Sequence, residues 1–149
     1  MEKKEHTLKN TVMSLPRKFI VFLGRTLSGH NHDDKMLKQE FPPDMDWFSD
    51  LHIRVDWGYQ GIQADYPLDQ LDIPYKKPRK SQKNPQPALS AAQKAVNKAL
   101  SHIRIFVEHA MGGMKRYNIV VHSFRNRTAH FEDEAIGICA GLWNLILSY

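Results

Sequence analysis

The chain has 149 residues, enough for one domain with a buried core and too few for two domains of ordinary size. Hydrophobic residues make up 42% and charged residues 25%, which argues against wholesale disorder. Lysine and arginine total 21 against 16 acidic residues, and this excess of +5 favours an anionic partner, most often nucleic acid.

The single cysteine, Cys139, excludes a disulfide within the chain and makes an intracellular setting the default expectation. The most apolar run, residues 135–147, is shorter than the ~20 residues that a membrane helix needs. The first six residues are charged or polar and lack the apolar core of a signal peptide. We therefore expect no membrane association.

The order of predicted elements favours an α/β fold. Short runs rich in β-branched and aromatic residues predict strands at 7–15, 18–27, 51–55 and 71–75, the last at a sheet edge because it contains Pro74. Capping and apolar periodicity predict helices from Asp33 or Asp34 to Glu40, from Ser90 to about Gly112–Gly113, and from about Glu132 onward. Because strands precede, separate and follow helices, we expect a mixed sheet with flanking helices.

The long predicted helix carries an apolar stripe and a polar stripe. The apolar stripe repeats at steps of three and four residues from Val96 to Met114 and must be buried. Glu108 lies one turn from Arg104, and we expect it at the edge of the buried face, where metal affinity can be tuned. The alternative is an ordinary i,i+4 ion pair on a solvated face, which stabilises a helix by ~0.2–0.5 kcal/mol.

Asp56 follows an apolar strand and precedes a turn containing Gly58 and Gly61. Side chains at strand ends of open α/β sheets face the ligand crevice, so Asp56 is a candidate metal ligand. The alternative is that Asp56 only orders the turn through bonds to its backbone. Two carboxylates, Asp56 and Glu108, with a basic loop between them suit the Mg²⁺ sites of nucleic-acid hydrolases and strand-transfer enzymes.

Other candidate sites have simpler explanations. Residues 30–34 (H-N-H-D-D) lack a second ligand group at metal-site spacing, so helix capping is the better interpretation. Cys139 and the three tryptophans read as core residues. The basic, proline-containing loop at about 76–87 either contacts phosphates or is simply solvated, and the residues leave both open.

Six short motifs, in order, resemble bacterial insertion-sequence transposases of the DDE superfamily and the related Harbinger-like DDE endonucleases. They are H-T-L-K-N at 6–10, S-G-H-N-H-D at 28–33, V-D-W-G-Y-Q-G at 55–61, P-Y-K-K-P at 74–78, N-x3-S-x2-R-x3-E-x6-K at 97–115 and F-R-N at 124–126. The resemblance covers essentially the whole chain. The helix motif from Arg104 to Lys115 is its most specific part.

The resemblance implies an RNase H-like fold in which three acidic residues bind two Mg²⁺ (or Mn²⁺) ions for DNA cleavage and strand transfer. By position, Asp56 matches the second acid and Glu108 the third. Arg104 and Lys115 match basic residues expected to orient Glu108 and contact the DNA backbone. The implied partners are DNA at the element ends and another transposase polypeptide or further copies of the chain. The implied location is the bacterial cytoplasm, in association with the nucleoid.

Two departures from the family pattern shape the expectation. Ser101 stands where the family has a tyrosine. The first acid belongs upstream of the H-T-L-K-N motif, so we expect residues 1–149 to form a single partial catalytic domain, truncated at the N-terminus and without the first core strand. Asp33 or Asp34 could substitute for the missing acid, although nothing in the sequence places them there. We expect the isolated chain to be inactive; the alternatives are a non-catalytic fragment that binds DNA or a transposase, and a plain basic α/β domain that binds no metal.

Overall fold

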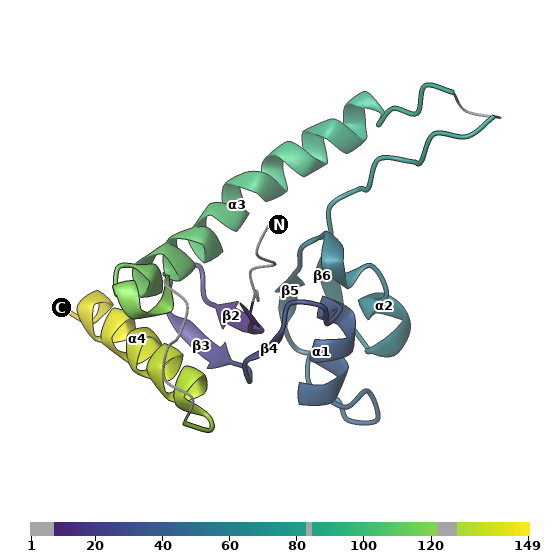
Figure 1. The fold of residues 1–149 in the computed structure, drawn as a ribbon. Coiled ribbons are helices and arrows are strands. Elements are labelled where there is room, and N and C mark those ends of the chain that lie inside the picture. The colour runs from purple at the N-terminus through teal and green to yellow at the C-terminus, as the bar shows by residue number, and fades with distance from the viewer. Residues whose placement is uncertain (1–7, 83–84, 122–127) are drawn as a thin grey trace, which may run out of the picture. The chain divides into compact units, whose positions relative to one another are not determined.

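The computed structural model describes residues 8–82, 85–121 and 128–149, so Lys83, Asn84 and the F-R-N motif lie outside the described residues. The chain divides into two compact units, which we describe separately. One unit contains Met1–Asn31 and Ile103–Tyr149, and the other contains His32–His102. Both units contain helices and small sheets, which is compatible with the predicted α/β class (Figure 1).

The first unit begins with two antiparallel strand pairs. Its strands are β1 (Leu8–Lys9) with β4 (Leu27–Ser28), and β2 (Val12–Ser14) with β3 (Ile20–Leu23). The predicted strands 7–15 and 18–27 thus pair with each other in antiparallel fashion, and each is divided into two shorter strands. One reason is Asn10, whose side-chain amide donates to Gly24 O at 3.0 Å and to Thr26 Oγ1 at 2.8 Å, so a side chain takes the place of a ladder partner.

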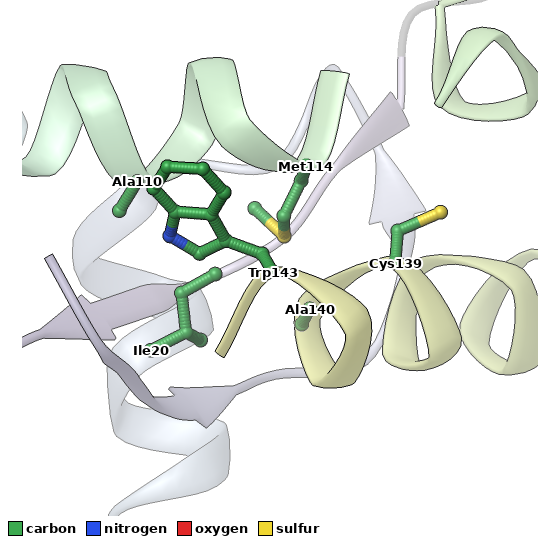
Figure 2. Close-up of a cluster of buried hydrophobic side chains, with 6 residues drawn as sticks. All are labelled: Ile20, Ala110, Met114, Cys139, Ala140 and Trp143. Atoms are coloured by element: carbon green, nitrogen blue, oxygen red, sulfur yellow. The ribbon is translucent and has the colours of Figure 1, made fainter. Parts of the chain in front are cut away.

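Two helices complete the core of this unit. The second part of α3 (Ala91–Lys115) and α4 (Phe131–Leu147) bury a cluster with β3, and η2 (Asn118–Val120) joins its rim. Figure 2 shows Trp143 among Ile20, Ala110 and Met114. The predicted apolar stripe of α3 is confirmed at its C-terminal end, where Ala110 and Met114 are buried, while Val96 is 44% exposed.

The second unit packs four short elements around a small core. They are α1 (Asp33–Glu40), β5 (His52–Arg54), α2 (Ile62–Asp65) and β6 (Gln70–Asp72), with η1 (Trp57–Tyr59) after β5. Its buried side chains are Met36, Leu37, Phe48, Ile62 and Tyr66. The Tyr66 hydroxyl donates to Phe41 O at 2.6 Å, which satisfies the polar end of a buried ring. β5 and β6 pair in parallel, as expected for strands joined by a crossover.

The structure corrects several predictions. The described strands form three two-stranded sheets and not one mixed sheet, so the RNase H-like arrangement stays a prediction. The N-cap of α1 is His32, not an aspartate, and its side chain makes no capping bond. Ser90 caps α3 as predicted: its Oγ accepts from Gln93 N–H at 3.1 Å while the Gln93 side chain accepts from Ser90 N–H.

The apolar periodicity of α4 predicts one buried face, and the observed buried face is rotated from it. The predicted face consists of Ala135, Ile138, Cys139, Leu142 and Leu145. Ala135 and Cys139 are buried as predicted, and burial raises the pKa of the Cys139 thiol. Ile138 is 64% exposed, because Ala140 and Trp143 turn toward β3 in its place. Of the tryptophans only Trp143 is a core residue, since Trp47 and Trp57 are exposed. No described helix is long and apolar enough to cross a membrane.

Candidate metal and DNA site

Asp56 lies where the chain leaves β5 and enters η1. The preceding residue, Val55, donates its N–H to Asp72 O at 3.1 Å, which extends the parallel β5–β6 pairing by one bond. Asp56 is the N-cap of η1, and its Oδ1 accepts from Trp57 N–H at 2.8 Å. The turn-ordering alternative is therefore confirmed as one role of this side chain. The bond also fixes the direction of the carboxylate, so the two roles are compatible.

Side chains reinforce the strand end that carries Asp56. Asp72 Oδ2 lies 2.7 Å from His52 Nε2 and accepts from Arg54 Nε at 3.1 Å. Arg54 Nη2 lies 3.2 Å from His52 Nδ1, which closes a three-membered cross-strand cluster. Asp72 thus binds β5 through both its backbone and its side chain. No local signal indicated this role, since Asp72 was predicted only as part of an edge strand.

Carboxylates of α1 lie against the turn after Asp56. The Asp33 side chain contacts the Cα of Gly58 so closely that a Cβ there would overlap it. Burial, followed by the charges of Asp33, Glu40, Asp56 and Asp34, raises the pKa of Tyr59 to about 12. The sequence did not place Asp33 and Asp34 near Asp56. The glycine at position 58 was the available signal, because its missing side chain allows α1 to approach the turn.

A lysine partly balances this acidic surface. Lys38 Nζ lies 2.8 Å from Asp65 Oδ2 and 3.0 Å from Asp34 Oδ2. Hydrogen bonding to Asp65, and then to Asp34, raises the pKa of Lys38, so the ammonium stays charged at all physiological pH values. The pair joins α1 to α2 within the second unit.

Glu108 and Arg104 form the i,i+4 pair that the sequence predicted. Arg104 Nε donates to Glu108 Oε1 at 3.1 Å, and the two side chains are 50% and 56% exposed. Glu108 therefore lies farther from the core than predicted, on the open face of α3. Ser101 Oγ donates to Lys98 O at 2.7 Å, so this residue serves its own helix. Lys115 is the exposed last residue of α3.

Comparison with known proteins decides the family. Residues 1–144 match the DDE superfamily endonuclease family. The chain is 33% identical over 146 residues to the probable transposase for insertion sequence element IS702 of Microchaete diplosiphon. This chain belongs to the DDE superfamily. The alignment covers 97% of this chain and 48% of the relative, so the chain spans about half the length of that transposase. No solved structure gives a significant match.

Family membership confirms the resemblance but leaves the site residues as predictions. Asp56 belongs to one unit, whereas Glu108, Arg104 and Lys115 belong to the other. Among the described residues, no group of three or more histidine, cysteine or acidic side chains is gathered to hold a metal ion. The donor chemistry of Asp56 and Glu108 nevertheless fits a hard cation such as Mg²⁺, since both offer carboxylate oxygens at the surface of rigid elements.

Proposed function

We propose that this chain is the catalytic-core portion of a DDE transposase, with an RNase H-like fold and an ancestral activity of Mg²⁺-dependent DNA cleavage and strand transfer. The observation that carries the proposal is the family match over residues 1–144, supported by 33% identity to a transposase. The structure adds two exposed carboxylates, Asp56 at the end of a strand and Glu108 on a helix face.

In this proposal Asp56 and Glu108 hold Mg²⁺ or Mn²⁺, and such ions stabilise both the attacking and the leaving oxygen at phosphorus. The protein's contribution is orientation. The bond from Trp57 N–H fixes Asp56, and the bond from Arg104 fixes Glu108. Arg104 is a positioning residue whose guanidinium also neutralises part of the Glu108 charge before a cation binds. Lys115 adds a positive charge at the end of α3, suited to a DNA phosphate.

We further propose that the isolated chain does not cleave DNA. Two carboxylates give a metal site less negative charge and fewer ligands than the three of the family pattern, so cation affinity falls. The test is Mg²⁺-dependent cleavage of element-end DNA by the purified chain, with the Asp56→Ala variant as control. We expect no cleavage above that of the variant. Robust cleavage by the unchanged chain would contradict the proposal that the isolated chain is inactive. If Asp56→Ala abolished that cleavage, the result would support a metal-binding role for Asp56.

A second candidate function is non-catalytic: the chain binds DNA or a transposase polypeptide and complements or inhibits it. Its support is the net charge of +5, which favours an anionic partner. The test adds the purified chain to two cleavage reactions, one of a full-length transposase and one of an inactive transposase polypeptide. Complementation of an otherwise inactive polypeptide supports a split enzyme, whereas dose-dependent inhibition supports a regulator. An unchanged reaction excludes both forms of this alternative.

A further inference from the structure

A long stretch of the chain carries positive charge without any acidic residue. Residues 73–107 contain eight of the 21 lysines and arginines, while all 16 aspartates and glutamates lie outside them. In the described part of this stretch six basic side chains belong to the second unit. We call these the basic strip: Lys76, Lys77, Arg79, Lys80, Lys94 and Lys98. A field of one sign over this length attracts a polyanion.

The structure anchors the beginning of the strip to α3. Asn97 Oδ1 accepts from Tyr75 N–H at 2.8 Å, and Asn97 Nδ2 donates to Tyr75 O at 2.9 Å. One side-chain amide thus satisfies both backbone groups of Tyr75, as a neighbouring strand would. The anchor lies immediately before Lys76 and Lys77. It therefore holds two adjacent cations beside the first turns of the helix.

Proline and exposure shape the segment that follows. Pro74 and Pro78 flank the two lysines, and proline restricts the chain to extended conformations with less entropy to lose on binding. Lys76, Lys77, Arg79 and Lys80 are all exposed. Because the prolines keep this backbone extended, its charges are spaced along the chain. Such spacing suits the regularly repeated phosphates of a nucleic-acid strand.

The helix contributes charges at a small cost to its own stability. Lys94 and Lys98 are exposed and stand four residues apart, so they repel each other by ~0.2–0.5 kcal/mol. Asn97 lies between them in the sequence, and no acidic residue in α3 precedes Glu108. Two lysines that repel each other on a helix, with no acidic residue nearby in that helix, are typical of a binding surface.

We propose that the basic strip binds the sugar-phosphate backbone of double-stranded DNA and that Asn97 is its positioning residue. The inference rests on the proposed function only in taking DNA as the polyanion. The strip consists of six cations, the side chains that neutralise phosphates, so the backbone is the surface of the duplex that its charge pattern suits. Its binding is therefore strongly dependent on salt.

The test measures binding of the full chain to a random 30-base-pair duplex by fluorescence anisotropy across a salt series, without divalent metal. Each neutralised phosphate contributes about 0.9 to the slope of log affinity against log salt. We expect the double variant Lys76→Gln/Lys77→Gln to lower the magnitude of the slope by about one to two. The control Arg17→Gln/Lys35→Gln removes the same charge from exposed sites elsewhere, and it keeps the slope of the unchanged chain. Equal slopes for the two double variants would contradict the proposal that Lys76 and Lys77 contact DNA phosphates.

The affinity for DNA tests the positioning role of Asn97 separately from the charge of the strip. Asn97→Ala frees the segment without removing a charge, so we expect affinity to fall about three- to tenfold while the slope stays unchanged. Asn118→Ala, an exposed asparagine outside the strip, controls for loss of an amide. Unchanged affinity in Asn97→Ala, with circular dichroism showing a folded chain, would overturn the positioning role.

One further outcome would exclude DNA as the partner. Binding to phosphatidylserine vesicles with no binding to the duplex would overturn DNA as the partner. Because the measurement contains no divalent metal, failure of the metal assignment to Asp56 and Glu108 leaves its result unaffected. The proposal for the basic strip and the proposed catalytic function are therefore tested independently.

Discussion

At the scale of single residues, Gly113 of α3 packs tightly against Trp143 of α4 in the first unit. The indole ring lies directly against the α3 backbone, where a Cβ at position 113 would overlap several ring atoms. The ring cannot move away freely, since its Nε1 donates to Lys18 O at 3.0 Å and the residue is only 9% exposed. Lys18 itself has a φ of 69°, a left-handed conformation that this bond helps to hold.

This contact makes Gly113→Ala destabilising even though alanine is the better helix former. We expect the free energy of unfolding to fall by about 1–3 kcal/mol, as for other overpacked cores. Gly112→Ala is the matched control, because nothing lies within 4 Å of the added Cβ, and it should stabilise by up to about 1 kcal/mol. Urea unfolding measures both. A Gly113→Ala variant as stable as Gly112→Ala would contradict the packing of Trp143.

At the scale of elements, α4 is bonded to the N-terminal strands near both of its ends. Asp133 Oδ1 accepts from Thr26 N–H at 2.6 Å in the first turn of the helix. Asn144 Oδ1 accepts from Ile20 N–H at 2.9 Å, and Asn144 Nδ2 donates to Ile20 O at 2.7 Å. These bonds join residues more than 100 positions apart and satisfy strand groups that have no ladder partner on that side.

The bond at the helix start predicts a pH dependence. Hydrogen bonding from Thr26 lowers the pKa of Asp133, against an opposing effect of burial. A lowered carboxyl pKa contributes stability that is complete above the unfolded-state value of about 3.9 and is lost as pH falls through the folded-state value. The stability difference between the unchanged chain and Asp133→Ala should thus be full at pH 6 and shrink below about pH 4. Glu134→Ala, exposed in the same turn, controls for the helix dipole, and equal pH profiles for the two variants would exclude the Thr26 bond.

The bonds near the helix end predict a plain loss of stability. Asn144→Ala leaves the N–H and C=O of Ile20 unsatisfied in a part-buried position, which costs about 1–3 kcal/mol. Ser148→Ala, whose hydroxyl donates only within its own exposed helix end, should change stability by less than about 0.5 kcal/mol. Chemical unfolding of both variants checks the difference. A cost for Asn144→Ala no larger than that for Ser148→Ala would argue against the α4–β3 bonds.

Local sequence signals predicted these elements well and their burial less well. The Ser90 cap and the acids before Ala135 placed the helix starts correctly because capping and dipole effects act within one turn. The buried face of α4 was misjudged, since periodicity alone could not show that Ala140 and Trp143, and not Ile138, face β3. The pairing of Asp72 with β5 could not be predicted from local sequence either, because Asp72 and its partner Arg54 are 18 residues apart.

At the scale of the whole molecule, the family could be predicted from motif order and the assembly of the site could not. The strand before Asp56 and the Arg104–Glu108 turn form locally, and both are present. Asp56 and Glu108 belong to separate units, so a metal site that they share stays a prediction. The approach of Asp33 to the turn after Asp56 was not predicted either, because it joins segments of one unit that are far apart in the sequence.

Calorimetric titration of the chain with Mn²⁺ tests the proposed metal ligands, with Asp56→Asn and Glu108→Gln as the variants. Each removes one carboxylate charge, and the proposal that both carboxylates hold one cation predicts an affinity at least tenfold lower for each variant. Glu134→Gln removes an exposed carboxylate of α4 and should bind like the unchanged chain. If the unchanged chain binds no Mn²⁺, or if all three variants bind it as the unchanged chain does, Asp56 and Glu108 are structural carboxylates and the account is contradicted.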